Sequence, residues 1–253
     1  MLIVENLQFN YHSGPEILKQ ISFSLDDGQF MAILGNNGAG KSTMLKCLNR
    51  ILPAKHGRIY MDEQNLLQMP NREIAKRIAF VAQTVPDMQM TVHDIVMLGR
   101  RPYMRWGFTK SDHDIVHESM GRLDLLQLRG RFLNQLSGGE RQKVWIAAAL
   151  AQQTPALFLD EPTNALDPAH QAELIRLIRQ LHGQGKTLMV ICHDLNLPLA
   201  LGGRIVAIRD HGIAFDGPVE AMLELDLLGR VFETSFVLHR AVAGHERSIQ
   251  LSV

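Results

Sequence analysis

Two kinds of hydrophobic pattern run along this chain, and each predicts a different kind of strand. Residues 21–25 alternate strictly between apolar and polar side chains, which is typical of a strand with one buried and one solvent-exposed face. Residues 2–9 and 58–62 are compatible with neighbouring strands, so we expect a small antiparallel sheet. The second pattern is a short, nearly continuous apolar run, which suits a strand buried on both faces. These runs are 31–34, 78–82, 156–159, 188–192 and 204–208.

Segments with helical periodicity separate several of the apolar runs, notably residues 42–52 and 171–182. This alternation predicts a mainly parallel sheet covered by crossover helices, which is an α/β core. Residues 84–155 are too many for one crossover, and they contain helical patterns at 112–126 and 140–153. We therefore interpret them as an inserted helical subdomain.

The 253 residues are expected to form a single domain, 1–253, because 46% of them are apolar and no repeat or flexible linker interrupts the chain. Within it we place the antiparallel sheet and the α/β core at about 1–85 and 155–230, and the helical subdomain at about 86–154. A further helix is expected at 219–229. A short C-terminal extension, 231–253, receives no function.

Charge and cysteine content exclude several classes of protein. Lys and Arg number 26 and Asp and Glu also number 26, so the chain lacks the broad basic surface of a dedicated nucleic-acid binder, and we expect no nucleic-acid partner. Cys47 and Cys192 fit no disulfide or zinc spacing, which favours a reducing cytoplasm. The first ten residues include Glu5 and no basic segment, so we expect no signal peptide. No apolar stretch approaches the roughly 18 residues that a membrane span needs.

Polar or backbone-exposing residues directly follow four of the buried runs, and in open α/β sheets ligands bind beyond the carboxyl ends of the strands. These residues are Gly35, Gln83, the pair Asp160 and Glu161, and His193. We therefore expect a ligand site at this edge of the sheet.

Residues 35–42, here called the phosphate loop, match the pattern GxxxxGK[ST] between an apolar run and a helical segment. Glycines let successive N–H groups turn toward phosphate oxygens, and the helix N-terminus adds partial positive charge. Lys41 would bridge the β and γ phosphates, and the Ser42 hydroxyl would hold Mg²⁺. This context favours a phosphate site over a simple glycine-rich turn. The expected nucleotide contacts are Gly35, Asn36, Asn37, Gly38, Ala39, Gly40, Lys41, Ser42 and Thr43.

Asp160 and Glu161 end a buried strand, where the first carboxylate would hold Mg²⁺ and the second would orient an attacking water or take its proton. Two solvated charges at a strand end are the structural alternative. That alternative weakens because a phosphate loop is predicted at the same edge of the sheet.

Residues 136–140, with the sequence LSGGE and here called the signature segment, open a predicted helix. Ser137 and Glu140 have the spacing of a capping box, so a purely structural interpretation exists. Gly138 and Gly139, however, leave the N–H groups of the first turn uncovered, which suits a phosphate better than it suits helix stability. We favour the phosphate site and keep the capping box as its alternative.

These motifs, in this order and spacing, resemble the nucleotide-binding subunit of an ABC transporter from Met1 to about Ala221. The resemblance implies a P-loop NTPase core with a mainly parallel sheet, an N-terminal antiparallel β subdomain and an inserted helical subdomain. It also implies a head-to-tail homodimer in which each ATP lies between one subunit's phosphate loop and the signature segment of the other. The trans contacts would be Ser137, Gly138, Gly139 and Glu140.

The resemblance also assigns roles to single residues. Gln83 would sense Mg²⁺ and the attacking water, and Asp167 would cross the dimer interface. His193 would contact the γ-phosphate and position the water of Glu161. Tyr11 would stack on adenine, unless it is merely a turn aromatic beside a core residue, Phe9.

Residues 90–103, 166–171 and 192–196 resemble the importers of ferric siderophores, haem and cobalamin. This resemblance implies an ATP-hydrolysing subunit that energises uptake of a metal chelate through separate membrane permease subunits. The subunit would lie on the cytoplasmic face of the inner membrane and would meet a substrate-binding protein only indirectly. The alternatives are the ATPase subunit of a zinc or manganese importer or of an exporter, and a nucleotide-sensing module without hydrolysis. Soluble relatives of chromosome maintenance or translation would need coiled-coil arms or two cassettes, which this sequence lacks.

Overall fold

The computed structural model describes residues 1–84, 88–164, 166–192, 196–224, 227–232, 236–239 and 248–251. They belong to two compact units. One unit comprises Met1–Met69 and Ile178–Val253, and the other comprises Pro70–Leu177.

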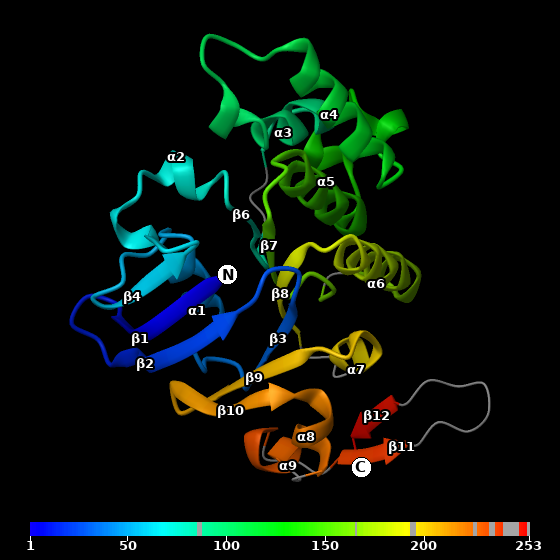
Figure 1. Cartoon of the computed structure of the whole chain (residues 1–253). Coiled ribbons are helices and arrows are strands. Elements are labelled where there is room, and N and C mark those ends of the chain that lie inside the picture. Colours follow the sequence, from blue (N-terminus) through cyan, green and yellow to red (C-terminus); the bar gives the residue numbers. More distant parts are fainter. Residues whose placement is uncertain are drawn as a thin grey trace. The chain divides into compact units, whose positions relative to one another are not determined.

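The first unit contains the antiparallel sheet that the alternating pattern predicts (Figure 1). Its strands follow the order β2-β1-β4-β5 and are β1 (Leu2–Asn10), β2 (Glu16–Leu25), β4 (His56–Met61) and β5 (Gln64–Asn65). Along β1 the buried positions change from even to odd numbers between Val4 and Leu7, where the register shifts. Asn6 has φ 48° at this point, so an irregular residue keeps both halves of the strand facing the core.

The first unit also holds four strands in the order β10-β9-β3-β8. The strand β3 (Phe30–Leu34) lies between two parallel neighbours, β8 (Thr187–Ile191) and β9 (Arg204–Arg209). Every residue of β3 is buried. The apolar runs of the sequence predicted these three strands. They did not predict β10 (Gly212–Pro218), which pairs antiparallel with β9 and alternates between half-buried and exposed residues.

Short helices complete the first unit. The helix α1 (Lys41–Leu48) ends four residues before the predicted position, because Arg50 adopts φ 52°, outside the helical region. The helix predicted at 219–229 is instead two short helices, α8 (Val219–Glu224) and α9 (Leu227–Phe232). The remaining elements are η1 (Leu66–Gln68), α7 (Asn196–Leu201), β11 (Phe236–His239) and β12 (Ser248–Leu251).

The second unit combines two parallel strands with helices. The strands are β6 (Ile78–Val81) and β7 (Ala156–Asp160). The helices α3 (Val92–Leu98), α4 (Lys110–Gly121) and α5 (Gly138–Ala151) pack on one another (Figure 1). The helix α4 ends five residues before the predicted position, and Asp124 has φ 56°. The other elements are α2 (Asn71–Ile74), η2 (Arg101–Tyr103), η3 (Leu126–Leu128), η4 (Leu133–Gln135) and α6 (Pro168–Gly183), which begins in this unit. In the described part of the chain, no helix is long and apolar enough to span a bilayer.

A buried ion pair joins the three packed helices. Arg100, next to the end of α3, donates from Nε to Asp112 Oδ1 of α4 at 2.8 Å, and both side chains are less than 10% exposed. The same guanidinium donates to the Ala151 carbonyl at the end of α5 and lies 4.2 Å from the ring centroid of Tyr103. One cation therefore connects α3, α4 and α5.

Asp112→Asn should destabilise the protein, because it leaves the Arg100 cation buried without a counter-charge. We expect a loss of about 3 kcal/mol in the free energy of unfolding, measured by urea denaturation at pH 7. Asp114→Asn, an exposed change on the same helix, is the matched control. Equal losses from the two substitutions would contradict the structural role of the ion pair.

The same ion pair predicts a pH dependence. Burial alone would raise the pKa of the Asp112 carboxyl, but hydrogen bonds from Thr109 and Arg100 outweigh burial and lower the pKa from 3.8 to about 2. A carboxyl whose pKa is lower in the folded chain stabilises the fold above its unfolded pKa, and this stabilisation is lost as the pH falls through the folded pKa. The difference in stability between the wild type and Asp112→Asn should therefore shrink between about pH 5 and pH 2.

Candidate functional site

The phosphate loop joins β3 to α1 and contains three glycines with positive φ. These are Gly35 with φ 144°, Gly38 with φ 81° and Gly40 with φ 104°. Gly40 occupies the N-cap position of α1, so no capping side chain competes for the N–H groups of the first turn. A helix N-terminus of this kind is suited to bind an anion.

Two of these glycines are also required by the space around them. A Cβ on Gly35 would lie 2.3 Å from the carbonyl oxygen of Ile208 in β9, and a Cβ on Gly40 would lie 2.6 Å from the carbonyl oxygen of Ile17 in β2. Both distances are far below van der Waals contact. The loop is therefore held tightly between the two sheets of the first unit.

Lys41 is 4% exposed although it carries a charge. Its Nζ donates to the carbonyl oxygens of Gly35 at 2.8 Å and Asn36 at 3.0 Å, so the ammonium lies across its own loop. The loop thus presents a cation together with the helix N-terminus, which is a favourable setting for phosphate.

Tyr11 lies beside the same helix. Its hydroxyl is 3.2 Å from Thr43 Oγ1, and its ring packs edge-on against Phe9 with 4.8 Å between centroids. Phe9 is buried, as the sequence alternative expected, whereas Tyr11 is 44% exposed. An exposed aromatic ring next to a phosphate loop is available for stacking on a base.

In the second unit, the pairing of β6 with β7 determines where Gln83 and Glu161 lie. Val81 is level with Leu159 in this parallel pair, so the residues two positions further on reach the same edge. Gln83 Nε2 accordingly donates to Glu161 Oε2 at 2.5 Å. The sequence predicted that both residues lie at this edge, because each follows a buried strand, but it did not predict the hydrogen bond between them.

Glu161 is positioned more strictly than a surface carboxylate would be. It is 8% exposed and adopts φ 47°, a conformation that costs energy for a residue other than glycine. Asn164 Nδ2 donates to the same Oε2 atom that accepts from Gln83. The adjacent Asp160 is 1% exposed at the end of β7. Sequence reasoning missed Asn164, because nothing in its local pattern shows that the turn after β7 brings it back to Glu161.

The signature segment begins α5, and its capping box is present. Ser137 Oγ accepts from the N–H of Glu140 at 3.2 Å, and Glu140 Oε2 accepts from the N–H of Ser137 at 2.8 Å. Hydrogen bonds from the backbone N–H of Ser137 and then from its side chain lower the pKa of the Glu140 carboxyl. The structural interpretation of this spacing is therefore confirmed. The capping box does not decide whether the segment also binds phosphate. Both interpretations are compatible, because the capping box would order the same turn that a phosphate would contact.

Asp167 immediately precedes α6, and its carboxylate accepts hydrogen bonds from His170. The backbone N–H and then the side chain of His170 lower the pKa of this carboxyl. The side chain of Asp167 is nevertheless 58% exposed. A charged and exposed residue whose carboxylate is held by two hydrogen bonds is suited to an interface.

The predicted site residues thus fall into three groups. The phosphate loop and Tyr11 belong to the first unit, whereas Gln83, Asp160, Glu161, the signature segment and Asp167 belong to the second. His193 lies outside the described residues. Sequence reasoning also missed His170, although it lies in the segment 166–171 that carries part of the family resemblance.

Comparison with known proteins identifies the class. The sequence model of the ABC transporter family matches residues 18–164. An uncharacterized ABC transporter ATP-binding protein of Methanocaldococcus jannaschii is 40% identical over 223 residues, which are 88% of this chain and 87% of the relative. The petrobactin import ATP-binding protein of Bacillus subtilis is 33% identical, with 92% of this chain and 93% of the relative covered.

Solved structures agree with these relatives. One chain of an inward-facing ABC transporter of proposed metal-chelate type superimposes on this protein with a TM-score of 0.85 and 28% sequence identity. The match covers 100% of this protein and 97% of that chain. A dimeric ATP-binding cassette in a post-hydrolysis state with ADP and Pi has a TM-score of 0.78 and 28% identity, over 87% of this chain and 99% of its own.

The chain therefore belongs to the ABC transporter family. Within that family it is an ATP-binding subunit, an ABC-type ATPase with the α/β P-loop fold that the sequence predicted.

The steric role of the loop glycines leads to a stability prediction. Gly35→Ala should lower the free energy of unfolding by about 3 kcal/mol, because the new Cβ meets a backbone carbonyl and the φ is unfavourable. Gly38→Ala should cost only about 1 kcal/mol, because a Cβ there has the unfavourable φ but no atom within 4 Å. Urea denaturation of the two variants tests the difference, and equal costs would show that the loop can move away from β9.

Proposed function

We propose that this chain is the ATP-hydrolysing subunit of an importer that takes up a metal chelate, such as a ferric siderophore, haem or cobalamin, through separate permease subunits. The observation that supports hydrolysis is the buried Glu161, whose carboxylate oxygen receives hydrogen bonds from both Gln83 and Asn164. The similarity to a petrobactin import protein and to a transporter of proposed metal-chelate type supports the choice of cargo.

In this proposal the N–H groups of the phosphate loop and the Lys41 ammonium bind the phosphates, and Tyr11 stacks on adenine. The expected nucleotide contacts are Gly35, Asn36, Asn37, Gly38, Ala39, Gly40, Lys41, Ser42 and Thr43. Binding of this kind places positive charge where the γ-phosphoryl group would develop negative charge, which is the main requirement of phosphoryl transfer.

The residues proposed to hold Mg²⁺ have suitable chemistry. Ser42 supplies a hydroxyl, Asp160 a carboxylate and Gln83 an amide oxygen, and Mg²⁺ prefers oxygen ligands. Gln83 uses its Nε2 to donate to Glu161, which leaves its amide oxygen as the acceptor atom. When bound, the ion would neutralise charge on the phosphates.

Glu161 is proposed to orient the attacking water and to accept its proton. His193 would position that water and contact the γ-phosphate, an assignment that rests on its place in the sequence. Two copies would pair head to tail, so that Ser137, Gly138, Gly139 and Glu140 of one copy complete the site of the other, with Asp167 crossing the interface. The dimeric cassette with ADP and Pi supports the pairing of two copies.

The proposed partners follow from the same class. The permease would contact the helical subdomain, expected at about 86–154, through residues 90–103 and the segment after Gln83. The subunit would then lie on the cytoplasmic face of the inner membrane and would meet a substrate-binding protein only indirectly.

Glu161→Gln should reduce ATP hydrolysis by at least about 100-fold, because the amide keeps the size of the side chain but cannot accept a proton. ATP affinity should stay within a few-fold, and an ATP-dependent dimer should accumulate in size-exclusion chromatography. Glu118→Gln, an exposed change on α4, is the control. Normal turnover by Glu161→Gln would remove Glu161 from its proposed role.

Lys41→Ala should instead weaken ATP binding itself, because the Lys41 ammonium is proposed to bind the phosphates.

The cargo is tested separately. The Glu161→Gln protein should be purified with ATP present from membranes of the cells in which it naturally occurs. It should retain a polytopic permease, which mass spectrometry should identify as the metal-chelate type. Recovery of a zinc or manganese permease, or of an exporter, would contradict the proposed cargo and leave the ATPase assignment in place.

A further inference from the structure

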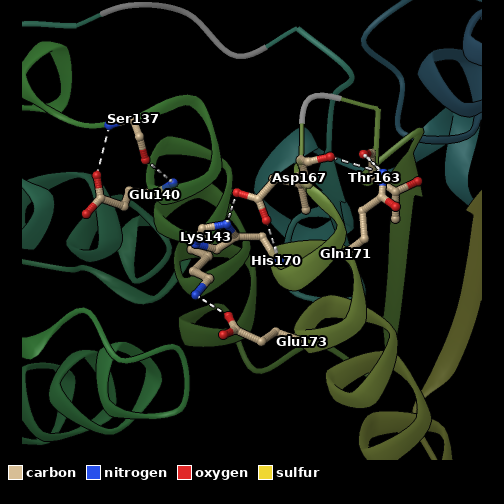
Figure 2. A network of polar contacts seen from close by, with 9 residues as sticks. Ser137, Glu140, Lys143, Thr163, Asp167, His170, Gln171 and Glu173 are labelled. Atoms are coloured by element: carbon tan, nitrogen blue, oxygen red, sulfur yellow. Dashed lines mark hydrogen bonds and ion pairs between the residues drawn. The ribbon is translucent and has the colours of Figure 1, made fainter.

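One histidine holds Asp167 at both of its oxygens. The backbone N–H of His170 donates to Oδ1 at 3.0 Å, and the ring Nδ1 is 2.7 Å from Oδ2 (Figure 2). A carboxylate accepts hydrogen bonds and does not donate, so Nδ1 carries the proton in this contact. The exposed carboxylate of Asp167 is thereby kept in one orientation.

The same imidazole ring lies close to the signature segment. A Cβ added to Gly139 would be 3.4 Å from His170 Cγ and 3.5 Å from Nδ1, so the ring borders the space that the absent side chain of Gly139 leaves. His170 therefore lies beside the beginning of α5 and holds the residue before α6 with two hydrogen bonds.

Other contacts brace the same junction. Lys143 of α5 forms an ion pair with Glu173 of α6, next to the His170 ring in Figure 2. Gln171 Nε2 donates to the carbonyl oxygens of Thr163 at 3.2 Å and Leu166 at 3.1 Å, which fixes the turn that precedes α6. The Lys143–Glu173 ion pair therefore joins the two helices, and the His170 side chain, which holds Asp167, lies close to Gly139.

Two further carboxylates lie near the same junction. The pKa of Glu140 is lowered mainly by hydrogen bonds from Ser137, and the pKa of Glu173 is lowered mainly by the hydrogen bond from Lys143. The nearby His170 adds to both effects, which agrees with its place between α5 and the start of α6.

We propose that His170 is a positioning residue for ATP hydrolysis. It couples Asp167 to the signature segment, so that both keep a fixed position relative to each other when they contact the partner's nucleotide. This inference rests on the proposed function, in which both segments contribute to the site of the other copy. Preorganisation matters there because a displacement of about 1 Å at a reacting group can cost about 100-fold in rate.

Two substitutions separate positioning from general stability. His170→Leu keeps much of the side-chain volume but removes the Nδ1 donor, so kcat for ATP hydrolysis should fall on the order of tenfold. The ATP affinity of the single subunit should stay within about twofold, because the phosphate loop is untouched. His170→Asn offers an amide N–H near the position of Nδ1 and should restore most of kcat. His117→Leu, a change at an exposed histidine on α4, should have no effect.

A double-variant comparison tests the route of the effect. If His170 acts through Asp167, then kcat of Asp167→Ala combined with His170→Leu should equal that of Asp167→Ala alone. Multiplied losses would overturn the inference, and so would a failure of His170→Asn to restore more activity than His170→Leu.

Ser137→Arg, tested in parallel, distinguishes failure of this inference from failure of the proposed function. It should block turnover and leave ATP binding to one subunit intact. If it blocks turnover while His170→Leu hydrolyses ATP like the wild type, only the role of His170 is overturned. If Ser137→Arg turns over normally, the trans site is refuted, and the role of His170 is refuted with it.

Discussion

The pairing of two parallel strands is the constraint on which the candidate catalytic site depends. Because β6 and β7 run side by side with Val81 level with Leu159, their carboxyl ends deliver Gln83 and Glu161 to one place. A second donor, Asn164, reaches the same carboxylate oxygen from the turn after β7. Burial of Glu161 strengthens these contacts, since hydrogen bonds are stronger where water is excluded. The cost is the positive φ of Glu161, which the surrounding packing maintains.

A related constraint shapes the phosphate loop. The strand β3 lies between two parallel neighbours and is completely buried, so its end leaves little room for the chain that follows. A Cβ on Gly35 would lie 2.3 Å from the carbonyl oxygen of Ile208, so no side chain fits where the chain leaves β3. The tight packing of the strand and the uncapped N-terminus of α1 therefore belong to one arrangement, in which glycines let the loop pass close to its neighbours and leave the N–H groups of the helix open.

The helices of the second unit use polar groups in two different ways. Arg100 and Asp112 are buried and join α3, α4 and α5, so their charges serve the fold. Asp167 and Glu140 are more exposed and are held by short-range hydrogen bonds at the beginnings of α6 and α5. A charge that must act on a ligand has to remain accessible and yet be fixed in direction, and hydrogen bonds to helix ends achieve both. This contrast explains why similar residues have structural roles in one place and candidate functional roles in another.

The sequence by itself determined the class of fold, the family and most of the candidate site, because these are written in short local patterns. Alternation, apolar runs and the phosphate loop each depend on neighbours within a few residues. The sequence did not predict the strand β10 or the early end of α1, because edge pairing and the positive φ of Arg50 depend on distant contacts. Only the tertiary structure brought Asn164 to Glu161 and the ring of His170 close to Gly139. Such contacts join segments whose meeting depends on how strands and helices pack, and no local pattern records that packing.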